Sequence, residues 1–218
     1  RISGLDFDNT EQECNRDGVD GRQGNHNFLI ENITGNIINN SQKYEVGTNT
    51  ADGWHSSWIG LQYKPSSSMV MATNEEIEEM MELGADVMFE ENGKQMIDWA
   101  KVTTAYEMMA TNVKNNSNVI VCAEKVAFSN MTITQYLDTV KSQLSSVYTS
   151  VTFSEPTSQD VGGIIFTRVD VKTTYMGVNI NQTYMVTKMH DRMVSLIFTC
   201  TTPKSLDSML AGFSAYTG

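Results

Sequence analysis

Four strand-like segments in the C-terminal half place the strongest constraint on the fold. They cover about residues 149–154, 163–174, 178–188 and 192–201, and the last three are joined by turns near Gly177 and at 189–191. A parallel pair would need a crossover connection of a dozen or more residues, so strands joined by such short turns pair antiparallel. The sequence therefore predicts an antiparallel sheet in this part of the chain.

Amphipathic helices are predicted between groups of strands. Thr73 with Glu76, and Thr132 with Gln135, form capping boxes. They begin predicted helices over about 75–91 and 132–147, and a third helix follows Pro203, with an apolar stripe of Leu206, Met209, Leu210 and Phe213. Further strands are predicted at 58–63, 69–72, 106–111 and 118–126. This order indicates an α+β fold, an antiparallel β-sheet flanked by helices in an α/β/α sandwich.

The chain has 218 residues, and its amino-acid composition changes near residue 50. Residues 1–50 are rich in Asp, Asn, Gly and Gln and predict a polar N-terminal extension, with one or two short strands around 27–46. Residues 51–218 are predicted to form the α+β domain. Apolar runs fall far short of the roughly 20 residues that span a bilayer, so no transmembrane helix is predicted.

Charge is spread unevenly along the chain. The formal net charge is −11, and residues 1–99 account for −12 against +1 for the remainder. Such acidity excludes a basic, phosphate-neutralising face, so we expect no nucleic-acid partner. The acidic half instead favours contact with a basic protein or a cationic ligand.

The predicted helix 75–91 carries eight acidic residues and no basic one. Together with Trp54 and Trp58 it supplies the candidate partner-binding residues, which are Glu75, Glu78, Glu79, Glu82, Trp54 and Trp58. An ordinary solvated helix face is the alternative interpretation of these glutamates. Trp54, His55 and Trp58 could stack a sugar ring, or the tryptophans could close one end of the core.

The sequence contains no recognisable catalytic motif. A Gly-x-Ser-x-Gly elbow, a P-loop and a dinucleotide fingerprint are all missing. The acids Asp6, Asp8, Asp17 and Asp20 could bind Ca²⁺ through oxygen ligands, but their spacing is not that of an EF-hand. We therefore predict no catalytic residue, no cofactor and no metal ligand.

Three cysteines, Cys14, Cys122 and Cys200, cannot all pair with one another. Cys122 and Cys200 lie in apolar, strand-like runs. We predict that both are unpaired and buried, on adjacent or facing strands.

Several dispersed segments resemble one family. They are Thr73-Asn74-Glu75-Glu76-Ile77, Ala105-Tyr106-Glu107-Met108-Met109-Ala110, Tyr136-Leu137-Asp138, Tyr184-Met185-Val186-Thr187-Lys188, Met193-Val194-Ser195-Leu196 and Ser208-Met209-Leu210-Ala211-Gly212-Phe213. Over about residues 55–218 the chain is similar to secreted lipoproteins of unknown function from Gram-positive gut bacteria, which carry a PsbP / Mog-type domain. The resemblance implies an antiparallel sheet flanked by helices, an extracytoplasmic location and a lipid anchor, and it brings no catalytic residue. Cys14 follows Glu11-Gln12-Glu13, which is not a lipobox, so the anchoring residue is expected upstream of Arg1.

Taken together, these features predict a non-catalytic lipoprotein domain that works by protein or ligand contact at the cell envelope. Two alternatives stay open at this point. One is a small hydrolase with an unrecognised active site, and the other is a glycan-binding module that uses Trp54, His55 and Trp58.

Overall fold

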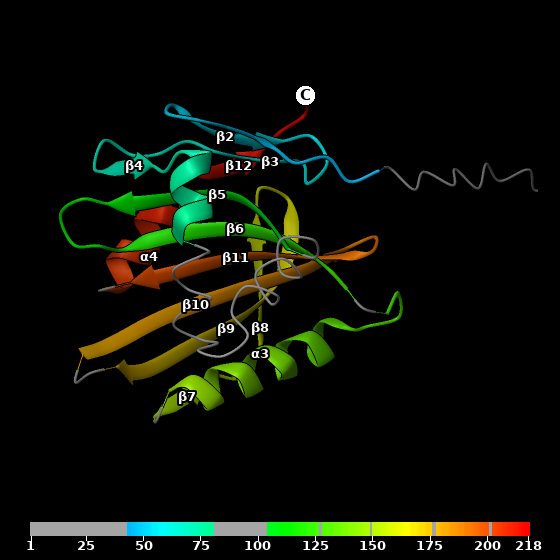
Figure 1. Ribbon diagram of the computed structural model, residues 1–218, viewed down its shortest axis with the longest axis vertical. Helices are drawn as coiled ribbons and strands as arrows, with labels where there is room; N and C mark the ends of the chain where they lie inside the picture. Colours follow the sequence, from blue (N-terminus) through cyan, green and yellow to red (C-terminus); the bar gives the residue numbers. More distant parts are fainter. Residues whose placement is uncertain (1–42, 81–103, 127, 149, 176–177, 201) are drawn as a thin grey trace, which may run out of the picture. The chain divides into compact units, whose positions relative to one another are not determined.

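The computed structural model describes residues 43–80, 104–126, 128–148, 150–175, 178–200 and 202–218 (Figure 1). A small sheet of four antiparallel strands has the order β1-β2-β3-β12. Its strands are β1 (Thr48–Thr50), β2 (Gly53–Ser56), β3 (Leu61–Tyr63) and β12 (Phe213–Ala215). β1 pairs with β2, so the folded domain includes residues before position 51.

The large sheet has the order β4-β5-β6-β11-β10-β9-β7, with β8 also paired to β9, and its strand pairs are antiparallel (Figure 1). This confirms the predicted α+β class with antiparallel strands. The strands are β4 (Met69–Met71), β5 (Thr104–Asn112), β6 (Asn118–Lys125), β7 (Val151–Phe153), β8 (Thr157–Val161), β9 (Ile164–Tyr175), β10 (Val178–Met189) and β11 (Arg192–Cys200).

Both predicted capping boxes are present. Helix α3 (Ile133–Val147) begins after Thr132, whose hydroxyl accepts from the Gln135 amide while the Gln135 side chain accepts from the Thr132 amide. Another helix begins at Asn74 after Thr73 and is described as far as Met80. Helix α4 (Pro203–Leu210) has Pro203 in its first turn, as predicted.

The third helix is shorter than its apolar pattern indicated. Phe213 was expected on the helix stripe, but α4 ends at Leu210 and Phe213 begins β12. A close approach of backbone explains the difference, because the Gly212 oxygen accepts from the Lys64 amide at 2.9 Å. A Cβ at position 212 would lie 2.5 Å from the Tyr63 ring, so glycine lets the chain leave the helix here and join β3.

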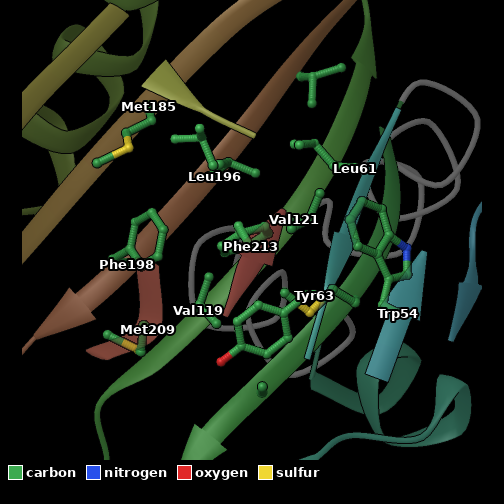
Figure 2. Close-up of a cluster of buried hydrophobic side chains, with 14 of the residues drawn as sticks. Trp54, Leu61, Tyr63, Val119, Val121, Met185, Leu196, Phe198, Met209 and Phe213 are labelled. Carbon is green, nitrogen blue, oxygen red and sulfur yellow. The ribbon is translucent and has the colours of Figure 1, made fainter. Parts of the chain in front are cut away.

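Two hydrophobic clusters lie on opposite faces of the large sheet. Alternation along β11 separates them, since Val194, Leu196 and Phe198 belong to the larger cluster and Met193 to the smaller. The larger cluster joins the sheet to the small sheet and α4 (Figure 2). The smaller cluster includes Leu137 and lies beneath α3. One face is thus covered by α3, and the other by a second sheet together with α4.

The two described cysteines match their prediction. Cys122 on β6 and Cys200 on β11 are unpaired and buried, and these strands are neighbours. Burial raises the pKa of the Cys122 thiol to about 12 and that of Cys200 to about 11. Since the thiolate is the reactive form, both should resist alkylation near neutral pH.

A labelling experiment tests this assignment. We expect native protein treated with a maleimide to be modified at Cys14 at most, and protein in denaturant at all three cysteines. Peptide mass spectrometry identifies the labelled sites. Rapid native labelling of Cys122 or Cys200 would show that the strand assignment is wrong.

Several predictions concern residues 1–42, which lie outside the described residues. They are the polar extension with its strands around 27–46, the acids Asp6, Asp8, Asp17 and Asp20, and Cys14. In the part that the structure describes, no helix combines the length and apolarity that a membrane span requires.

Candidate functional site

The acidic helix that begins at Asn74 is fixed at its first turn. The Thr73 amide donates to Glu76 Oε2 at 2.8 Å, and the Glu76 amide donates to Thr73 Oγ1 at 3.2 Å. Ile77 is buried, whereas Glu75, Glu78 and Glu79 are exposed. Carboxylates near a helix N-terminus are stabilised by the helix dipole. Three of the predicted binding glutamates are therefore exposed to solvent on a helix whose first turn is capped. The fourth, Glu82, lies outside the described residues.

Two grooves flank this helix. The Tyr106 groove has a volume of about 320 Å³, and its lining includes Val46, Gly47, Ile77, Glu78, Tyr106 and Glu107. The Met80 groove has a volume of about 410 Å³, and its lining includes Val70, Met71, Glu76, Glu79, Met80, Met109 and Val113. Glutamates of one helix thus border a groove on each side.

Exposed apolar side chains gather at the same place. Five of the nine large hydrophobic side chains that are exposed among the described residues line these grooves. They are Val46, Val70, Met80, Tyr106 and Val113. Apolar side chains gathered at the surface and bordered by polar groups mark interaction sites more often than isolated ones do.

Glu107 is one of the residues that line the Tyr106 groove, and it is only 1% exposed. Its carboxylate accepts from the Tyr44 hydroxyl at 2.5 Å, from the Gly47 amide at 2.6 Å and from Trp54 Nε1 at 3.2 Å. The pairing of β5 with β6 shifts between Tyr106 and Met108, so Glu107 occupies a β-bulge. We refer to Glu107 and its three donors as the Glu107 network.

Burial raises the pKa of Glu107, while the three donated hydrogen bonds and the Arg192 charge oppose the rise. Burial also raises the pKa of Tyr44. The Arg192 guanidinium carbon lies 3.7 Å from the centre of the Tyr44 ring, and its Nη1 donates to the Ala123 oxygen at 2.9 Å. These contacts fasten residues 44–47 to β5, and Val46 and Gly47 thereby become a wall of the groove.

Gly47 leaves no room for a side chain in this network. A Cβ at this position would lie 2.5 Å from Trp54 Nε1, 2.6 Å from the His55 oxygen and 2.7 Å from Glu107 Oε2. Because the His55 oxygen is backbone, we expect Gly47→Ala to lower the free energy of unfolding by about 1–3 kcal/mol. Urea denaturation measures it, with the exposed Thr48→Ala as control; equal stability of the two variants would contradict this packing.

The structure places the two candidate tryptophans, Trp54 and Trp58, in the core. Both are buried, and neither is among the residues that line the Tyr106 groove or the Met80 groove. Trp58 packs edge-on to the Tyr44 ring at 5.0 Å and lies 5.7 Å from His190, while His55 stacks on Tyr216 at 4.6 Å. A sugar ring stacks on an exposed ring face, so the structure favours the core-closing interpretation over the glycan site.

Within the described ranges, no three side chains of His, Cys, Asp or Glu are grouped closely enough to hold a metal ion.

The sequence predicted the exposed glutamates of the acidic helix, but it did not predict most of the other residues that line the two grooves. The alternation in Met69-Val70-Met71 places both methionines on one face of the strand, and both are buried, which leaves Val70 outward. A single charged residue inside the apolar strand pattern was the available signal for Glu107. Tyr44 and Val113 had no such signal, because their positions depend on tertiary contacts.

Comparisons with known proteins give no family assignment. No protein-family model matches the chain, and no curated protein matches it. Among solved structures, it is similar to the cyanobacterial PsbP protein CyanoP from Synechocystis sp. PCC 6803, with 10% identity and a TM-score of 0.47, over 80% of this chain and 99% of that one. It is also similar to a protein from Bacteroides thetaiotaomicron VPI-5482, with 11% identity and a TM-score of 0.42, over 76% of this chain and 48% of that one. Function must therefore be inferred from the residues of the domain itself.

Proposed function

We propose that this domain is a non-catalytic binding module that contacts a partner protein through its acidic helix and the two grooves beside it. The observation that carries the proposal is the gathering of exposed apolar side chains around the solvent-facing glutamates. Apolar contact supplies affinity by removing surface from water, and the carboxylates supply orientation and speed of encounter. A basic partner protein suits this combination better than a small cation, because the grooves offer apolar surface as well as charge.

We further propose that the module works outside the cytoplasm, at the cell envelope, held by a lipid anchor upstream of Arg1. The support is the resemblance of segments such as 73–77 and 105–110 to secreted lipoproteins. Feeding cells an alkyne-tagged fatty acid tests this location. Label on the protein in the membrane fraction is the expected result, and unlabelled protein in the cytosol would contradict it.

Capture from the native cell envelope tests the binding role. The bait variant carries Gln at Glu75, Glu78, Glu79 and Glu82. A matched control neutralises four acids elsewhere on the surface, at Asp138, Glu155, Asp191 and Asp207, which are all exposed. We expect wild type and control to capture the same protein at low salt, and the helix variant to lose it, because charge steering weakens when charge is removed or screened.

Two results would contradict the binding role. One is equal capture by wild type and helix variant at low and high salt, which would make the helix an ordinary solvated face. The other is an equal loss of capture by the control, which would show a general charge effect and no local surface.

A further inference from the structure

We propose that the Met80 groove holds a basic peptide segment of the partner protein, with an apolar side chain in the groove and a Lys or Arg side chain beside Glu76 and Glu79. The inference rests on the proposed binding function and specifies which side of the helix is used and what chemistry the partner presents there. Three properties of the groove carry it.

The first property is an apolar floor with exposed walls. Met109 is buried beneath the groove, whereas Val70, Met80 and Val113 remain 56%, 41% and 64% exposed. The volume of about 410 Å³ lies in the range of pockets that take small organic groups, so it suits inserted side chains. An occupant that covers the valines and Met80 removes apolar surface from water, which favours binding.

The second property is a one-sided charge. Glu76 and Glu79 are three residues apart on the helix, so they lie on the same helical face, along one wall of the groove. Among the residues that the structure describes, no Lys, Arg or His lines the groove. An occupant with cationic groups on that side is therefore favoured. A second copy of this chain is disfavoured, because each copy carries a formal net charge of −11.

The third property is adaptability. Two methionines, Met80 and Met109, contribute to the lining from the face of the sheet on which Val70 is exposed. Their unbranched side chains fit apolar groups of different shape. We therefore expect the groove to accept Leu, Ile, Phe or Met from the partner, while the carboxylates require a positive charge next to it.

Synthetic peptides test the chemistry directly. The probe is a fluorescein-labelled 12-residue peptide with alternating Lys and Leu, titrated with the full chain at 20 and 300 mM NaCl and followed by fluorescence anisotropy. Two comparison peptides alternate Lys with Ser, or Glu with Leu. We expect the Lys/Leu peptide to bind at least about tenfold more tightly than either, because each comparison peptide lacks one of the two contacts.

Matched variants locate the binding site. Glu76→Gln with Glu79→Gln should weaken Lys/Leu binding about tenfold at low salt and remove most of its salt dependence. Glutamine at position 76 keeps an oxygen for the Thr73 amide, so the helix cap is retained. The control is Glu155→Gln with Asp138→Asn, which makes the same charge change on another exposed surface and should change affinity less than about twofold.

The apolar contact has its own pair of variants. Val70→Thr with Val113→Thr should weaken binding about fivefold at both salt concentrations, since it replaces a methyl with a hydroxyl and leaves the charges in place. Ile165→Thr is the control, because Ile165 is also exposed on a strand and lines neither groove. It should bind the peptide like wild type.

The proposal is overturned if the groove variants bind the Lys/Leu peptide as wild type does, or if the Glu/Leu peptide binds equally well. Light scattering could instead show that the wild type is a dimer and that the variant with Val70→Thr and Val113→Thr is a monomer. That result would overturn the proposal in favour of a second copy of the chain as the occupant. Envelope capture that depends on the helix glutamates but not on the two valines would defeat this inference and leave the binding function standing. Capture that depends on neither would defeat both.

Discussion

Phe198→Ala is expected to lower the free energy of unfolding by about 3–5 kcal/mol, because it removes a completely buried ring from the larger cluster. Phe198 on β11 lies 6.1 Å from the Phe213 ring on β12, in an edge-to-face arrangement (Figure 2). The pair therefore joins the large sheet to the small one. The variant loses this contact between sheets as well as the buried area of the ring.

The same substitution at the surface provides the control. Phe128 is 68% exposed, so Phe128→Ala should stay within about 0.5 kcal/mol of wild type. Urea denaturation followed by circular dichroism measures both variants. Similar losses for the two would mean that the assignment of the core is wrong.

Glu107→Leu is expected to cost about 3 kcal/mol, although leucine is apolar and similar in size. The change leaves the Tyr44 hydroxyl, the Gly47 amide and Trp54 Nε1 without their acceptor. A buried donor that loses its partner carries the full cost of its desolvation. Removing one member of a buried charged group is costly for the same reason.

Glu107→Gln separates charge from hydrogen bonding, since glutamine retains one oxygen acceptor. It should be the milder change, and a loss equal to that of Glu107→Leu would show that the acceptor oxygens are not what stabilises this region. Partial proteolysis adds a local readout, because residues 44–47 are held by this network. We expect cleavage near Tyr44 to be faster in Glu107→Leu than in Glu107→Gln.

Protonation of Glu107 has a predictable sign. Burial raises its pKa in the folded state, so the folded protein binds this proton more tightly than the unfolded chain does. The stability that the proton contributes is complete below the ordinary glutamate value of about 4.3 and is lost as the pH rises through the folded pKa. The stability of wild type relative to Glu107→Gln should therefore fall as the pH rises above about 4.3. A constant difference across pH 4–8 would contradict the raised pKa.

Local sequence patterns predicted most of the large sheet. The strands β9, β10 and β11 and the helix α3 lie within one or two residues of their predicted bounds, because alternation and capping boxes are local signals. β8 was not predicted, because Thr157–Val161 is polar and lacks the apolar alternation of the other strands. The separate small sheet could not be foreseen, since β12 reaches β3 from more than 140 residues away.

In the candidate site, too, local sequence patterns predicted some features, whereas others depend on tertiary contacts. The run of acidic residues in the sequence identified the helix and its exposed glutamates. The Met80 groove brings Val70 of β4 and Val113, just after β5, beside that helix. No spacing in the sequence relates these two valines to each other. The sequence left two roles open for the tryptophans, partner binding and closure of the core, and their burial follows from the packing of the small sheet.

Site-specific photo-crosslinking in living cells tests most directly whether this surface contacts a partner. A photoreactive phenylalanine analogue would replace Val70 or Val113 in the Met80 groove, and Ile165 on β9 as the exposed control. We expect irradiation to join the groove positions to one partner protein, through a peptide that contains Lys or Arg, and we expect no such product from Ile165. Crosslinks of equal yield from Ile165, or none from either groove position, would contradict this expectation.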